Sequence, residues 1–136
     1  MYKKIIVAVD IAEFEKGERI LRKASTLLDG GGSLLLLNVV ENLPGYLVSD
    51  LSVDLIVKAR QEAEQTLIDL KAKAGVTAEI EIREGSPARE ILAAAEQRKA
   101  DLIVVASHVP DFSNYFIGAT ADRIVRYAKC SVLIDR

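Results

Sequence analysis

The stretch from Lys4 to Asp10, Lys-Ile-Ile-Val-Ala-Val-Asp, holds five consecutive apolar residues between charged ones. This continuous apolar run, rich in β-branched residues, is typical of a strand that is buried on both faces of a parallel sheet. It is too short for the apolar region of a signal peptide, about 7–15 residues, or for a membrane-spanning helix of about 20 residues. We therefore expect a soluble protein that is not exported by this route.

Four further runs along the chain have strand-like composition. They are Ser33–Val40, Thr77–Arg83, Leu102–Ala106 and Ser131–Ile134. The run from Thr77 alternates apolar with charged residues, which predicts a half-exposed strand at a sheet edge. The run from Ser131 is short, apolar and last in the sequence, and we expect it to lie at an edge as well.

Segments with the three- and four-residue spacing of helices separate these runs. The first contains Ile20 to Leu28 and is expected to end at Gly30-Gly31-Gly32. The second is expected from about Asp50 to Ala74, ending at Gly75, with one buried stripe made of Leu51, Leu55, Ala59, Ala63, Leu67 and Leu70. The third begins at Ser86-Pro87, with Ile91, Leu92 and Ala95 facing the core, and the fourth spans Ala119–Ala128.

Strands that alternate with helices predict parallel pairing through right-handed crossovers. The expected fold is a doubly wound α/β domain, a five-stranded parallel sheet with helices on both faces. At 136 residues the chain fits one domain, 1–136.

Composition excludes several classes of function. Hydrophobic residues make up 50% of the chain, which excludes disorder throughout, and 18 basic against 20 acidic residues are too balanced for a polybasic nucleic-acid binder. With one cysteine, Cys130, and one histidine, His108, the chain can form neither an intrachain disulfide nor a His/Cys zinc site. We expect a cytoplasmic protein with no nucleic-acid or membrane partner.

A ligand site is expected beyond the carboxyl end of the first strand. In open α/β sheets ligands bind where the strand order reverses, which nominates Asp10. The segment that faces Asp10 depends on the strand order: Glu84-Gly85-Ser86 in the order 2-1-3-4-5, or Ser107-His108 in the order 3-2-1-4-5. Alternatively, Asp10 only caps the first turn of the segment that follows it.

The segment from Ala106 to Thr120 lies between a predicted strand and a predicted helix. Gly118 precedes the helix, whose free N–H groups and positive dipole end can bind a phosphate; a plain turn is the other interpretation of this glycine. The segment contains no lysine or arginine, so Mg²⁺ or the more distant Arg123 and Arg126 would have to balance the charge of a phosphate.

The start of the chain, Lys4 to Asp10, and its end, Ala106 to Ile134, resemble the universal stress protein family, and the resemblance covers the whole chain. ATP-binding members of that family carry Gly-x-x-Gly, a spacer and Gly-Ser/Thr after the fourth strand. Here Ala106 and Val109 replace the first two glycines, and Gly118 is followed by Ala119 and Thr120. The Ala-Ser-His-x-Pro-Asp segment, with a Cys-Ser-Val-Leu ending, is most similar to the F/G-type branch, some of whose members bind ATP.

The resemblance implies an adenine nucleotide alpha hydrolase-like fold with the strand order 3-2-1-4-5, so that Asp10 faces Ser107 and His108. It implies that Asp10 lies by the nucleotide, that the backbone of Val39 meets the adenine edge, and that the loop with Gly118 takes the phosphates. The nucleotide-binding residues expected on this basis are Ala8, Val9, Asp10, Val39, Ala106, Ser107, His108, Val109, Gly118, Ala119 and Thr120. It also implies a homodimer formed through Ser131–Ile134.

We therefore expect a cytoplasmic stress-response protein that binds ATP, with Mg²⁺ as a possible companion, and acts as a nucleotide-dependent regulator. A dimeric interaction module that binds no nucleotide is the alternative, favoured by Ala106, Val109 and Ala119. A weak ATPase is the second alternative. One histidine and one cysteine, with no Ser-His-Asp ordering, suggest no catalytic set, so any hydrolysis should be slow.

Overall fold

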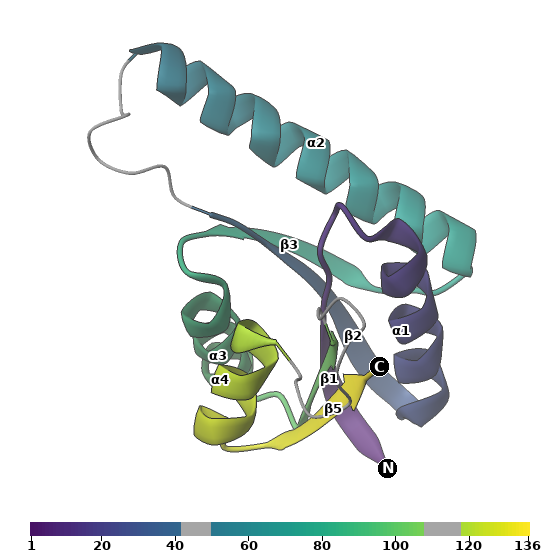
Figure 1. Ribbon diagram of the computed structural model, residues 1–136. Coiled ribbons are helices and arrows are strands. Elements are labelled where there is room, and N and C mark those ends of the chain that lie inside the picture. The colour runs from purple at the N-terminus through teal and green to yellow at the C-terminus, as the bar shows by residue number, and fades with distance from the viewer. Residues whose placement is uncertain (42–49, 108–117) are drawn as a thin grey trace.

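The computed structural model of the chain describes residues 1–41, 50–107 and 118–136, with side chains from residue 53 onward in the second helix. Strands and helices alternate along it (Figure 1). The elements are β1 (Tyr2–Ala8), α1 (Phe14–Leu27), β2 (Leu28–Val40), α2 (Asp50–Ala74), β3 (Glu79–Glu84), α3 (Pro87–Arg98), β4 (Leu102–Ala106), α4 (Ala119–Tyr127) and β5 (Ser131–Asp135). Within the described ranges, no helix is both long and apolar enough to cross a membrane.

The five strands form one parallel sheet in the order β3-β2-β1-β4-β5. This confirms the predicted doubly wound α/β fold and decides between the two strand orders in favour of 3-2-1-4-5. The central strand β1 pairs with β2 on one side, where Val7 lies opposite Leu36, and with β4 on the other, where Val7 lies opposite Val104. The predicted edge strands, β3 and β5, are the two edges.

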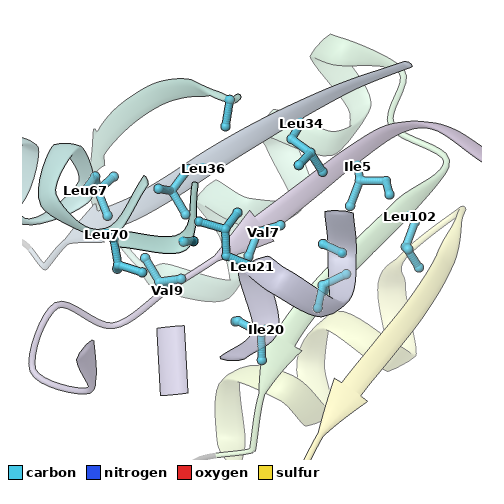
Figure 2. Close-up of a cluster of buried hydrophobic side chains, with 14 of the residues drawn as sticks. Ile5, Val7, Val9, Ile20, Leu21, Leu34, Leu36, Leu67, Leu70 and Leu102 are labelled. Carbon is cyan, nitrogen blue, oxygen red and sulfur yellow. The ribbon is translucent and has the colours of Figure 1, made fainter. Parts of the chain in front are cut away.

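Helices cover both faces of the sheet, and each face has its own hydrophobic core. Because successive side chains of a strand point to opposite faces, Val7 packs with α1 and α2, whereas Ile6 packs with α3 and α4. Figure 2 shows the first of these cores, where Ile20 and Leu21 of α1 and Leu67 and Leu70 of α2 surround side chains of the central strands.

The prediction that the first helix ends at the three glycines is wrong. Helix α1 ends at Leu27, and β2 begins at Leu28, so Gly30-Gly31-Gly32 lie inside the strand. The pairing of β1 with β2 is irregular there, since Tyr2 lies opposite Leu28 but Lys4 lies opposite Ser33. Gly31 has a φ of 83°, and a Cβ on Gly32 would lie 2.8 Å from the carbonyl oxygen of Lys3. The glycines therefore permit a bulged strand rather than a helix stop.

The predicted buried stripe of α2 is correct only in the carboxyl half of the helix. Ala63, Leu67 and Leu70 are fully buried, whereas the Leu55 side chain is 55% exposed; the Leu51 side chain lies outside the described residues. Helical spacing shows which residues share a face, but not how much of that face a neighbouring element covers. In this helix of 25 residues the packing against α1 and the sheet comes from the carboxyl half.

A buried carboxylate joins the end of β5 to α1. Asp135 is 7% exposed; its Oδ2 accepts a hydrogen bond of 2.6 Å from Nε of Arg19, and its Oδ1 accepts one from the Lys23 ammonium. Burial raises the pKa of Asp135, but the hydrogen bonds from Lys23 and Arg19 and their positive charges outweigh it, so the pKa lies below its ordinary value of 3.8. The Asp135 carbonyl also accepts a hydrogen bond of 2.7 Å from the N–H of Ser107.

Candidate functional site

A cavity of about 750 Å³ lies beyond the carboxyl ends of β1, β2 and β4. This is the end of a doubly wound sheet where ligands bind, because the connection after β1 leads to β2 on one side and the connection after the neighbouring β4 leads to β5 on the other. Nine of the eleven predicted nucleotide-binding residues line the cavity: Ala8, Val9, Asp10, Val39, Ala106, Ser107, Gly118, Ala119 and Thr120. The other two, His108 and Val109, lie outside the described residues.

The ends of β1 and β2 are held together at the cavity by a side chain that the sequence analysis missed. The N–H of Val9 donates to the carbonyl of Leu37 (2.9 Å), and the buried amide of Asn38 donates from Nδ2 to the carbonyl of Val9 (2.8 Å). The signal in the sequence is one amide directly after four leucines. Asn38 satisfies a backbone group that would otherwise lie unpaired where the two strands separate.

Asp10 shapes the turn that leads from β1 to α1. Its Oδ1 accepts a hydrogen bond of 2.9 Å from the N–H of Ala12, and its carbonyl accepts one of 3.0 Å from Glu13. The capping interpretation is therefore correct in part: Asp10 stabilises the turn, although the residue that precedes α1 is Glu13. Asp10 is exposed and also lines the cavity, so the turn holds its carboxylate at the site.

Gly118 directly precedes α4 and lines the cavity. Its φ of 89° and ψ of 152° form a conformation that side chains disfavour, and its carbonyl accepts the N–H of Asp122 (2.9 Å). A glycine has no side chain with which to cap the first N–H groups of the helix. Ala119, Thr120 and Ala121 follow along the cavity wall, so the amino end of the helix, which no described side chain caps, faces the cavity.

The charged side chains at the cavity differ from the predicted set. Asp10, Glu13 and Glu41 contribute carboxylates, and Lys16 contributes an ammonium. Arg123 and Arg126, which the sequence analysis invoked, do not line the cavity, and Arg126 pairs with Asp122 instead (3.1 Å). Lys16 is not among the predicted residues because it lies far in sequence from the segment Ala106 to Thr120, where the phosphates were expected. Its place soon after the first strand, at the predicted reversal point, is the signal that would have found it.

Much of the rest of the cavity wall is apolar. Ile11, Ile20, Leu37, Val39, Val40, Ile91 and Val105 contribute to it. Within the part of the chain that the structure describes, no group of three or more His, Cys, Asp or Glu side chains is placed to hold a metal ion. The site therefore combines an apolar wall, the amino end of a helix and a few charged groups, as binding sites for small molecules do.

Comparisons with known proteins cover the same span. The model of the universal stress protein family matches residues 1–136. A universal stress protein encoded beside a sulfhydrylase gene of Thermus aquaticus is 30% identical, and universal stress protein G of Shigella flexneri is 28% identical; each match covers all of both chains.

Solved structures share the fold. The hypothetical protein MJ0577 has a TM-score of 0.82 at 24% identity, covering 99% of this chain and 96% of that one. The universal stress protein from Archaeoglobus fulgidus, solved in complex with dAMP, has a TM-score of 0.67 at 20% identity, covering 99% and 98%. The match along all 136 residues, together with the sheet order, shows that this chain belongs to the universal stress protein family.

Proposed function

We propose that the chain binds an adenine nucleotide, ATP in complex with Mg²⁺, in the cavity at the ends of β1, β2 and β4, and acts as a nucleotide-dependent regulator in a cytoplasmic stress response. The observation that carries the proposal is the convergence of Asp10, Val39 and Gly118 on one cavity, although they come from three separate parts of the chain. A dAMP complex of a protein with the same fold supports it.

The two ends of the cavity suit the two ends of a nucleotide. The adenine ring would lie against the apolar wall, with its edge at the backbone of Val39, where β2 ends. The phosphates would lie at Gly118, because the first N–H groups of α4, which no described side chain caps, and its positive dipole end favour an anion. A volume of about 750 Å³ falls within the range of small-molecule sites, about 300–1,000 Å³.

Mg²⁺ fits this site only as a companion of the phosphates. The carboxylates of Asp10, Glu13 and Glu41 are the oxygen ligands that Mg²⁺ prefers, but no group of three acidic side chains in the described ranges forms a ready-made metal site. Mg²⁺ is commonly bound through one or two carboxylates, substrate phosphates and water, and when bound it would offset the phosphate charge. One or two of these carboxylates would hold it.

A regulatory role is favoured over rapid turnover. The segment from Ala106 to Thr120 has no lysine or arginine to stabilise the charge that develops in phosphoryl transfer. The second candidate function is an interaction module without a nucleotide, which Ala106 and Ala119 favour, since they replace a glycine and a hydroxyl residue of the ATP-binding pattern.

Isothermal titration calorimetry with ATP and Mg²⁺ tests the proposal, with Gly118→Val as the disrupting variant. Valine would occupy the space where a phosphate approaches the backbone and would strain a positive φ, so we expect no measurable binding. Gly75→Val is the matched control, because Gly75 also has a positive φ (67°) but lies away from the cavity with open space around it. Folded wild-type protein that gives no heat at millimolar ATP or AMP would establish the interaction module instead.

We also propose a homodimer formed through β5. The N–H of Ser107 bonds to the carbonyl of Asp135, so the backbone groups of Asp135 point toward β4. Because successive residues of a strand point their backbone groups to opposite sides, those of Val132 and Ile134 point toward the open edge. A second copy of β5 could pair with them and cover the edge.

A further inference from the structure

Lys16 is the one cationic side chain that lines the cavity among the described residues. The two segments that the structure does not describe, 42–49 and 108–117, contain no lysine or arginine in the sequence. Arg60 follows the cavity residue Ala59 but is held toward β3, where it donates to Glu84 (3.2 Å) and to the carbonyl of Ile82 (3.1 Å). Among the lysines and arginines, Lys16 is therefore the residue placed in the described lining to attract a ligand phosphate.

The ammonium of Lys16 makes a weaker ion pair than the charged groups of Arg19, Arg22 and Lys23, which lie on the same helix. Arg19 and Lys23 bind Asp135, and Arg22 binds Glu18 at 2.8 Å. Nζ of Lys16 lies 3.9 Å from Oε1 of Glu13, beyond hydrogen-bond distance, and its side chain is 35% exposed. Lysine has a flexible four-carbon side chain, so the ammonium can turn to a phosphate without breaking a hydrogen bond within the described part of the chain.

The described lining of the cavity is poor in positive charge. One ammonium, that of Lys16, stands against the carboxylates of Asp10, Glu13 and Glu41, so the charged side chains of the described lining sum to −2. Such a lining attracts one phosphate through Lys16 but opposes the several negative charges of a triphosphate that carries no metal. A neutral nucleoside has no phosphate, so it is neither attracted by Lys16 nor repelled by the carboxylates.

We propose that Lys16 binds the phosphate of the nucleotide and makes the cavity, without divalent cations, selective for adenosine monophosphate over both adenosine and ATP; this rests on the proposed function. Lys16 is thus a residue that determines specificity by charge. Added Mg²⁺ restores ATP binding, because the metal neutralises part of the triphosphate.

Binding of AMP, adenosine and ATP is measured by calorimetry in EDTA, and that of ATP again with Mg²⁺. A charge-assisted hydrogen bond contributes about tenfold in affinity, so Lys16→Met should weaken AMP binding about tenfold and leave adenosine binding unchanged. Lys16→Arg should restore most of the loss. Lys129→Met is the matched control: it also removes one positive charge and one ion pair with a glutamate, Glu96 at 3.2 Å, but Lys129 does not line this cavity.

The outcomes separate the two proposals. If folded wild-type protein binds none of the ligands, both the proposed function and the proposed role of Lys16 are rejected. If the wild type binds AMP but Lys16→Met leaves AMP binding intact, or weakens AMP and adenosine equally, the role of Lys16 is overturned while nucleotide binding stands. Equal affinity for AMP and ATP in EDTA would overturn the selectivity.

Discussion

Replacing Asp135 by asparagine should destabilise the fold far more than the loss of an ordinary surface ion pair. The carboxylate is 7% exposed and accepts hydrogen bonds from Arg19 and Lys23, whose side chains are 47% and 52% exposed. Hydrogen bonds to charged groups contribute about 1.5–3 kcal/mol each, but partial hydration of these partners reduces this to about 1 kcal/mol each. We expect a loss of about 2 kcal/mol in the free energy of unfolding.

Thermal unfolding followed by circular dichroism measures this loss. The entropy of unfolding, about 2.1 cal/mol/K per residue, gives about 0.29 kcal/mol/K for this chain, so the melting temperature should fall by about 7 °C at pH 7. Glu96→Gln is the control, since it removes an exposed pair with Lys129 and should lower the free energy of unfolding by under about 0.5 kcal/mol.

The effect should depend on pH in one direction. The pKa of Asp135 is lower in the folded chain than its ordinary value of 3.8, so its contribution is complete above that value and is lost as the pH falls through the lowered pKa. The difference between wild type and Asp135→Asn should therefore be constant from pH 5 to 7 and shrink in stronger acid. If Asp135→Asn melts within 1 °C of Glu96→Gln at pH 7, the reasoning about the buried pair is refuted.

Two further experiments test the packing and the open edge. Leu67→Ala should destabilise the chain by about 2–5 kcal/mol in urea unfolding, because its side chain is fully buried, whereas Leu55→Ala on the same helix should change stability by under about 0.5 kcal/mol; equal losses would contradict the packing of α2. Val132→Pro removes an N–H that points away from β4, so light scattering should show a dimeric wild type and a folded monomeric variant. A monomeric wild type at tens of micromolar, or an unchanged dimer in the variant, would reject the β5 interface.

The sequence predicts this fold well because its strands are short, apolar and regularly spaced. The alternation from Thr77 placed β3 at an edge, and Ser86-Pro87 marked the start of α3. The pattern alone could not choose between two strand orders, since both use the same elements and differ only in which strands pair. The three glycines were misplaced because glycine ends helices and also permits bulges, and the neighbouring strand decides which.

Most of the candidate site could also be predicted, because the carboxyl ends of parallel strands meet at one edge of the sheet. Asp10 and Gly118, expected from the pattern, and Val39, expected from the family resemblance, all line the cavity. Lys16 and Asn38 were missed for a different reason. Neither belongs to a motif, and each reaches the site only because α1 and β2 pack beside β1, which no local pattern reveals.

The central place of β1 has a consequence for how the chain folds. Ile5 lies opposite both Leu34 and Leu102, so one side of the strand is completed by residues 29 positions later and the other by residues 97 positions later. Closing the longer loop costs more chain entropy and slows folding, because such non-local pairings must form before they are stabilised by packing. Until β4 pairs with β1, the side of β1 that faces β4 in the folded sheet remains an unpaired apolar edge. An intermediate of β1, β2 and β3 would therefore be the species most exposed to aggregation during refolding.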